Sequence, residues 1–305
     1  MKISYAFRRS VFYPHQDARG PGNELPPKEV RRQYLQKVRE LGFEGIEVGV
    51  SSARGTEAEV RELGRELEGE GVPCAVIRGG GGFAHPRVAA QNRQRVADAI
   101  RTASWIGSNL VNTTVGTPTR LPQGTGTGVG ERAPQGSSRL ASEADFEITA
   151  KHLREAAEQA ADLGVEIAIE MHQHSIADNS WSCLHLLELI DRPNVGVNPD
   201  LGNLYWNYEV PEETSEACIA ALAPKAKYWH CKQLQRVHIP ELQKAYFLKV
   251  PLPDGEIDYR FAISAMVEAG YQGFLAVEGC REGDQLYRDG RSVAYCRQIL
   301  RELGE

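Results

Sequence analysis

The chain has 305 residues, of which 41% are hydrophobic and 25% are charged, with a net charge of −6 and a pI near 5.8. This composition is typical of a globular protein and excludes a disordered chain, a collagen and a disulfide-stapled miniprotein. An acidic surface repels phosphate backbones, and no apolar run reaches the ~18 residues of a membrane helix, so we expect neither a nucleic-acid nor a membrane partner. Six scattered cysteines without a CxxC pair, and a first segment without a signal-peptide pattern, predict a cytoplasmic protein with reduced thiols.

Strand patterns and helix patterns alternate along the whole chain. We expect strands at 2–7, 45–50, 73–77, 109–115, 165–170, 194–200, 226–232 and 273–279. We expect a helix after each of them, at 28–41, 57–70, 87–106, 142–163, 182–191, 212–222, 258–269 and 288–303. Eight such units predict an α/β protein with a (β/α)₈ TIM barrel, in a single domain over 1–305 because no linker divides the chain. A doubly wound open sheet uses the same alternation but has fewer units.

One long segment departs from this alternation. Residues 116–141, which follow the fourth expected strand, are rich in Gly, Pro, Thr and Ser and poor in apolar residues. Loops of this length are uncommon in compact domains unless they are functional or disordered. We therefore interpret the segment either as a lid on the catalytic rim of the barrel or as a passive insertion.

Polar residues stand at the ends of four consecutive expected strands. They are Glu170, Asp200, His230 and Glu278, separated by 30, 30 and 48 residues, roughly one strand–helix unit each time. Barrel enzymes place their chemistry at the carboxyl ends of the strands, so these side chains should meet on one rim. The alternative is that each acid caps the following helix or pairs with a barrel Lys or Arg.

Two Glu, one Asp and one His form a mixed oxygen and nitrogen ligand set. Carboxylates suit Mg²⁺ and Mn²⁺, and an imidazole shifts the preference towards Mn²⁺, Co²⁺ or Zn²⁺. We therefore expect a divalent metal, Mn²⁺ first, with Mg²⁺, Co²⁺ and Zn²⁺ as alternatives. No cysteine stands at an equivalent strand end, so a thiolate zinc site is not indicated.

Four segments carry a resemblance to a known superfamily: IAIEMH, VNPDLGNL, YWHCK and LAVEG, which lie between about 165 and 280. They resemble the signature segments of the xylose isomerase-like barrels, the sugar phosphate isomerase and epimerase superfamily. This group includes D-tagatose 3-epimerase, hydroxypyruvate isomerase, inosose dehydratase and endonuclease IV. The resemblance implies that Glu170, Asp200, His230 and Glu278 hold a divalent metal. In the epimerase branch it implies that the two Glu also carry protons on opposite faces of a sugar.

The chain also departs from these relatives. The epimerases have a His three residues after the strand-six Asp, where this chain has Asn203. Many relatives have an Asp after the strand-seven Lys, where Gln233 stands here. Endonuclease IV needs more histidines for its three-zinc cluster, so phosphodiester cleavage is disfavoured.

Three further residues are candidates for contact with substrate. In an extended segment i and i+2 point the same way, so His172 should share the side of Glu170, and Lys232 that of His230. His172 could act as a base or as a sugar ligand, or it could be a structural histidine on the rim, as we expect for His174. Lys232 could bind a hydroxyl, carboxylate or phosphate, or pair with a nearby acid. Glu47 resembles a Glu often found in this superfamily and could contact a sugar hydroxyl, support the metal site or form a buried salt bridge.

Other motifs carry no site assignment. Trp181, Trp206 and Trp229 could face a sugar, but most tryptophans are core or interface residues, so none is predicted as a site. The chain has no GxSxG and no P-loop, and GTGTGVG at 124–130 lacks GxGxxG spacing.

Three functions remain open. The first is a metal-dependent isomerase or epimerase of a sugar or polyol, with proton abstraction next to a carbonyl and a metal-stabilised enediolate. Glu170, Glu278 and His172 would be catalytic, and Lys232, Glu47 and His172 would bind substrate. The second is a lyase that eliminates a β-substituent from a keto-sugar, inosose or 3-keto-glycoside. The third is a non-catalytic sugar-binding or partner subunit. Because members of the superfamily often form homo-oligomers, the resemblance also implies a homo-oligomer as a possible assembly.

Overall fold

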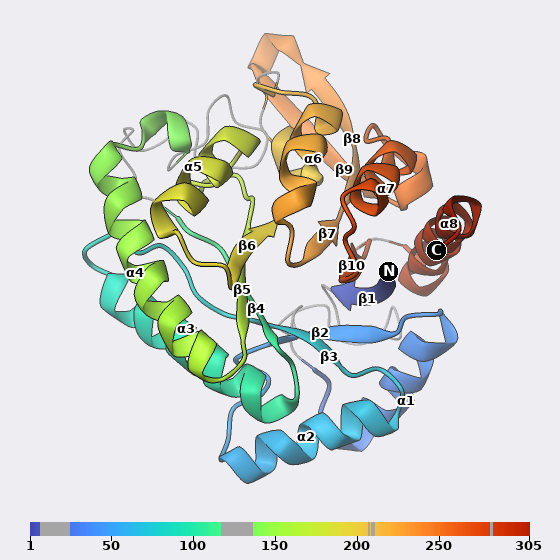
Figure 1. The fold of residues 1–305 in the computed structure, drawn as a ribbon. Helices are drawn as coiled ribbons and strands as arrows, with labels where there is room; N and C mark the ends of the chain where they lie inside the picture. The colour runs from blue at the N-terminus through green and yellow to red at the C-terminus, as the bar shows by residue number, and fades with distance from the viewer. Residues whose placement is uncertain (7–24, 117–136, 207, 209–210, 281–282) are drawn as a thin grey trace.

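Eight parallel strands surround the axis of the molecule and helices cover them from outside (Figure 1). The computed structural model describes residues 1–6, 25–116, 137–206, 208, 211–280 and 283–305. The barrel strands are β1 (Lys2–Ala6), β2 (Gly45–Gly49), β3 (Cys74–Arg78), β4 (Leu110–Thr113), β5 (Glu166–Glu170), β6 (Val195–Asn198), β7 (Trp229–Cys231) and β10 (Phe274–Glu278). The helices are α1 (Lys28–Glu40), α2 (Glu57–Gly69), α3 (Ala89–Ile106), α4 (Glu143–Asp162), α5 (Ser180–Ile190), α6 (Ser215–Leu222), α7 (Tyr259–Glu268) and α8 (Gln285–Leu303).

The strand order establishes a closed barrel. Neighbouring strands run β6-β5-β4-β3-β2-β1-β10-β7, and every pair along this order is parallel. The two end strands meet through a parallel bridge between Val197 and Ala226, where the N–H of Lys227 donates to the carbonyl of Val197 at 2.9 Å. The predicted TIM barrel is therefore confirmed, and the doubly wound alternative is excluded.

Alternation along the strands sorts their side chains into two cores. Outward residues such as Ile3, Val48 and Ile77 are fully buried against the helices. Inward residues form a separate small cluster inside the barrel: Ala6, Val76, Leu110, Ala168, Tyr228 and Ala276. Side chains of this size close the barrel interior, as in other TIM barrels. The inward-facing polar residues lie at the carboxyl ends of the strands.

Pro199 explains why β6 is shorter than the sequence pattern predicts. The expected strand at 194–200 ends in the structure at Asn198, because a proline has no N–H to donate to a neighbouring strand. Asp200 then begins a short 3₁₀ helix, Leu201–Tyr205, and its side chain accepts the N–H of Gly202.

A hairpin stands between β7 and α7, where the sequence analysis assigned no element. Strands β8 (Gln233–Ile239) and β9 (Lys244–Val250) pair antiparallel, with Val237 opposite Tyr246. Strand β8 begins just after Cys231, the carboxyl end of β7, and Figure 1 shows β8 and β9 outside the ring of barrel strands, near α6 and α7. The hairpin thus extends the carboxyl-end rim of the barrel.

Most of the predicted Gly-rich segment 116–141 lies outside the described residues, and so does its suggested role as a lid. Its described end forms a 3₁₀ helix at Ser138–Leu140. No helix in the described ranges is long and apolar enough to cross a membrane. All six cysteines are buried and unpaired with one another.

Asp289 ties α8 to the barrel wall. Its carboxylate accepts hydrogen bonds from the hydroxyl of Tyr5 in β1 and, at 2.9 Å, from the N–H of Cys280. Gln285 in turn donates to the Tyr5 hydroxyl at 2.9 Å. Burial raises the pKa of Asp289 from 3.8 to about 6, although the hydrogen bonds from Tyr5, Cys280 and Gln285 oppose the shift.

This raised pKa predicts a pH-dependent contribution to stability. Because the folded-state pKa lies above the ordinary one, protonation of Asp289 stabilises the folded state fully below pH 3.8, and the effect is lost as pH rises through 6. The unfolding free energy of the wild type relative to Asp289→Asn should therefore increase by roughly 1 kcal/mol from pH 7 to pH 5. Urea unfolding of the wild type and of Asp289→Asn at pH 5 and pH 7 measures this difference in unfolding free energy. A difference that does not change with pH would contradict the assignment.

Candidate metal centre

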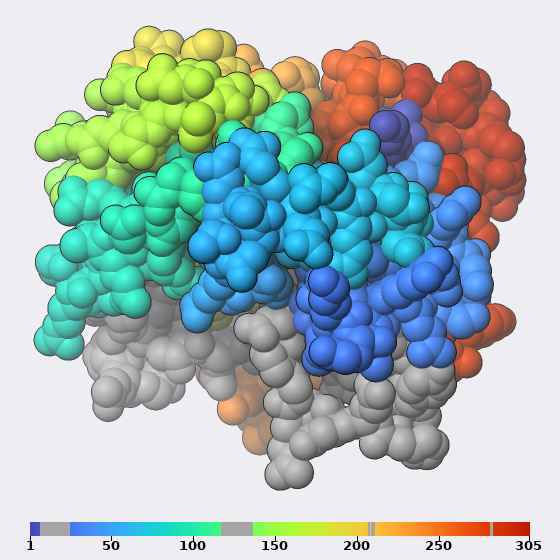
Figure 2. Space-filling view, turned by 90° about the horizontal axis from the view of Figure 1, so that it is seen from below, coloured from blue at the N-terminus to red at the C-terminus, as the bar shows by residue number. Residues whose placement is uncertain are grey.

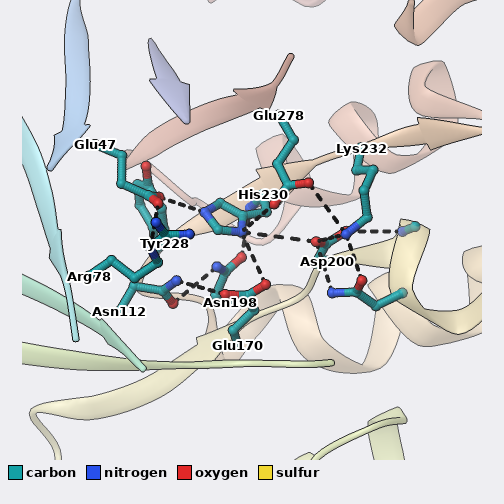
Figure 3. A network of polar contacts seen from close by, with 12 residues as sticks. Glu47, Arg78, Asn112, Glu170, Asn198, Asp200, Tyr228, His230, Lys232 and Glu278 are labelled. Carbon is teal, nitrogen blue, oxygen red and sulfur yellow. Dashed lines mark hydrogen bonds and ion pairs between the residues drawn. The ribbon is translucent and has the colours of Figure 1, made fainter. Parts of the chain in front are cut away.

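The four predicted ligands converge at the carboxyl end of the barrel (Figure 3). Glu170, Asp200, His230 and Glu278 are buried, and one ligand atom of each lies within 4.8 Å of the others. Glu170 and Glu278 are the last residues of β5 and β10, His230 is central in β7, and Asp200 follows β6. The strand-end argument thus brings all four residues together as expected.

His230 directs one ring nitrogen at the acids. Its Nδ1 lies 3.5 Å from Oε1 of Glu170, 3.7 Å from Oε1 of Glu278 and 4.0 Å from Oδ2 of Asp200. The other nitrogen, Nε2, lies 2.7 Å from Oε2 of Glu47. Nδ1 is buried and makes no hydrogen bond to any residue that the structure describes. A buried imidazole nitrogen facing three carboxylates fits a divalent cation, because its lone pair and the acids can all serve as ligands.

The surrounding charges also determine the protonation of His230. Burial lowers the pKa of the imidazole, but the negative charges of Glu47 and Glu170 outweigh burial and raise the pKa to about 9. A proton on Nδ1 therefore balances the acids at neutral pH when no metal is bound. Metal binding must displace that proton, since a histidine ligand is neutral.

Each glutamate of the centre has one oxygen facing His230 and the other held by a neighbour. Oε2 of Glu170 accepts a hydrogen bond from Asn112 at 2.9 Å. Oε2 of Glu278 lies 3.4 Å from Nζ of Lys232 and 3.5 Å from Nζ of Lys249. These contacts set the orientation of both carboxylates before any ligand arrives.

Two buried asparagines connect the opposite parts of the centre. Asn112 accepts a hydrogen bond from Asn198 at 3.1 Å, and Asn198 accepts the backbone N–H of His230 at 2.6 Å. A chain of amides thus runs from Glu170 to the backbone of β7 (Figure 3). Because each member is satisfied by the next, the network fixes the spacing between two proposed ligands.

Asp200 and Lys232 are held by the residue that departs from the epimerase pattern. Asn203 donates to Oδ2 of Asp200 at 2.9 Å and to the carbonyl of Met171 at 2.8 Å, and accepts from Lys232 at 2.6 Å. Lys232 itself lies 2.8 Å from Oδ2 of Asp200. Gly202 leaves room for this lysine, since a Cβ there would lie 2.9 Å from its Cε. Asn203 therefore positions both charged groups.

A cavity of about 410 Å³ opens beside this centre. Glu170 and Glu278 line it, together with Lys232, His172 and Trp206. The Nδ1 of His172 lies 2.6 Å from the carbonyl of Gln173, and burial lowers the pKa of this imidazole below its ordinary value. The cavity is of the size that takes a small ligand.

Glu47 is not among the described residues that line this cavity. It is buried between Nε2 of His230 and Nε of Arg78, which lies 3.4 Å from its Oε1. His174 adopts a left-handed backbone with φ of 63°.

Several residues of the site were not found by sequence reasoning. Asn112 and Asn198 could have been found, because they sit at inward positions of β4 and β6, in the same alternation that identifies Glu170. Trp206 lines the cavity, although no tryptophan was predicted as a site. Lys249 gave no signal, because it belongs to the unpredicted hairpin.

Comparison with known proteins agrees with this architecture. The family model described as xylose isomerase-like TIM barrel matches residues 35–298. No significant match was found among curated proteins.

Solved structures with the same fold include three informative examples. A xylose isomerase-like TIM barrel protein from Mycobacterium smegmatis in complex with magnesium is 23% identical, with 92% of this chain and 94% of that chain covered and a TM-score of 0.73. An L-ribulose 3-epimerase is 16% identical, with coverage of 99% and 95% and a TM-score of 0.72. The 3-keto-D-glucoside 4-epimerase of E. coli is 15% identical, with coverage of 89% and 95% and a TM-score of 0.67. The family model covers most of the chain, and the chain therefore belongs to the xylose isomerase-like TIM barrel family.

Proposed function

We propose that this protein is a metal-dependent isomerase or epimerase of a sugar or sugar-like polyol. One observation carries the proposal: Glu170 and Glu278 approach Nδ1 of His230 from opposite sides, each with one oxygen turned to the centre (Figure 3). Two carboxylates that face each other across a small ligand can remove a proton from one face and return it on the other.

The residues that would hold the metal are Glu170, Asp200, His230 and Glu278. A divalent ion bound there supplies a Lewis acid that stabilises negative charge on substrate oxygens during proton removal. Mn²⁺ is our first expectation because the set combines three carboxylates with one imidazole.

The remaining side chains would bind and orient the substrate. Lys232 and Lys249 place two ammonium groups on the cavity wall, 4.8 and 5.2 Å from the ring centre of Trp206. Such groups can hold sugar hydroxyls or a developing oxyanion. His172 lines the same wall and, with a lowered pKa, is neutral near pH 7, so it can accept a hydrogen bond there.

The similar structures support a sugar as substrate. Two of those compared above are described as sugar epimerases, one of them acting on a 3-keto-glucoside, and a third was solved with magnesium. The lyase reaction begins with the same proton removal, so it differs from our proposal only in the fate of the carbanion.

The first prediction of this proposal concerns metal content. Protein supplied with Mn²⁺ should hold about one ion per chain by elemental analysis, because only one such cluster occurs in the described residues. Asp200→Ala and His230→Ala should each reduce that occupancy strongly. Asp162→Ala and His185→Ala, which change the same residue types on outer helices, serve as controls. Full occupancy in the ligand variants would overturn the site.

The second prediction concerns the reaction. Ketoses, inososes and 3-keto-glycosides are each incubated with the Mn²⁺-loaded protein in heavy water. At least one of them should give an isomeric product in which one hydrogen has been replaced by deuterium. Mass spectrometry detects it. A product lighter by water or by an aglycone would show a lyase instead, and the absence of turnover and exchange on every compound would favour a binding subunit.

The third prediction separates proton transfer from metal binding. Glu170→Gln and Glu278→Gln keep an oxygen ligand but lose the base, so much of the metal should remain while kcat falls by ~10²–10⁴. Glu166→Gln is a matched control, since Glu166 lies at the other end of β5 and pairs with Lys227. Wild-type kcat in metal-loaded Glu278→Gln protein would remove this glutamate from catalysis.

A further inference from the structure

A second cavity adjoins the first on the outer side of the barrel. It has a volume of about 470 Å³ and lies between the segment that follows β2 and the exposed side of α3. Val50, Ser51 and Arg95 line both cavities, so the two are neighbours across these residues. Helix α3, which lines the second cavity, lies side by side with α2 on the near face of Figure 2.

Arginines dominate the charge of this second cavity. Arg54, Arg95 and Arg101 line it, and the one acid among the described lining residues is Asp98. Asp98 is engaged by Arg101 and also accepts a hydrogen bond from Gln94. Within the described ranges Arg54 and Arg95 form no ion pair. The cavity therefore carries a local excess of positive charge on a chain whose net charge is −6.

The other lining groups suit a ligand with a sugar ring. Trp105 is partly buried against the core and offers an aromatic surface. Ser51 and Thr102 add hydroxyl groups. The N-terminus of α2 does not contribute to anion binding, because Thr56 and Glu59 form a capping box that already satisfies backbone N–H groups there. Guanidinium groups hold carboxylates and phosphates through paired hydrogen bonds, so the arginines determine which ligand fits.

We propose that the second cavity is an anion subsite for the far end of the substrate. It would take a carboxylate or phosphate carried on a glycosyl unit or aglycone beyond the reacting sugar. The substrate is then an acidic glycoside of about disaccharide size, with its reacting ring beside Glu170 and Glu278 and its anion between Arg54 and Arg95. The reacting-ring part of this inference rests on the proposed function, whereas the anion subsite rests on the second cavity alone.

Inorganic phosphate tests the subsite directly. Calorimetric titration in low-salt, phosphate-free buffer should show one saturable site, in Mn²⁺-loaded protein and equally in protein stripped of metal and dialysed free of chelator. Arg54→Gln and Arg95→Gln should each weaken binding roughly tenfold or more. Arg93→Gln, an exposed arginine on another side of α3, should leave the affinity unchanged.

Trehalose 6-phosphate and trehalose distinguish a substrate tail from a free anion. On Mn²⁺-loaded protein the phosphorylated disaccharide should bind at least tenfold more tightly than both trehalose and inorganic phosphate, and Arg95→Gln should remove most of this advantage. Equal affinity for trehalose 6-phosphate and inorganic phosphate would overturn the tail assignment.

The outcomes separate this inference from the proposed function. Phosphate binding that is absent, that disappears with the metal, or that is equal in all arginine variants would overturn the subsite. Arginine-dependent phosphate binding in a protein without metal or turnover would uphold the subsite while the proposed function fails.

Discussion

The contact between Nε2 of His230 and Oε2 of Glu47 fixes the centre of this barrel. Because Glu47 holds one ring nitrogen at 2.7 Å, the other must face Glu170, Asp200 and Glu278. The carboxylate is itself held by Arg78, so the imidazole is oriented from behind by a buried ion pair. A histidine whose second nitrogen is anchored in this way has its ring orientation set before any metal would bind.

Burying four carboxylates in one barrel end carries a large desolvation cost, which the neighbouring cations and amides must offset. The groups that offset this desolvation cost differ from one carboxylate to the next. Glu170 is held by the neutral amide of Asn112, whereas Asp200 and Glu278 are next to the ammonium of Lys232. These contacts orient the cluster without a metal, so a divalent ion held by Glu170, Asp200, His230 and Glu278 would need little rearrangement of the side chains and would replace the proton of His230.

The sequence predicts this site well because a parallel barrel maps strand ends onto one rim. Glu170, His230 and Glu278 follow from that rule alone, and Asp200 follows although Pro199 ends its strand early, since the i, i+2 alternation continues through the proline. Asn112 and Asn198 follow the same alternation, but amides at strand ends do not stand out as metal ligands do. Lys249 and the pairing of β8 with β9 could not be predicted, because a two-stranded insertion on the rim has no counterpart in the repeating strand–helix pattern.

That insertion adds a residue to the cavity beside the centre. Lys249 of β9 reaches Glu278, and Phe247 of the same strand stacks near Trp206 with ring centres 6.4 Å apart. The hairpin thus contributes to the cavity wall without altering any barrel strand. The proposed metal ligands depend on the strands, whose spacing the closed sheet fixes. The groups that would meet the rest of the substrate come from the hairpin, from Trp206 and from the segment after β2. Changes in these connecting segments can alter substrate choice while the chemistry at the strand ends is retained.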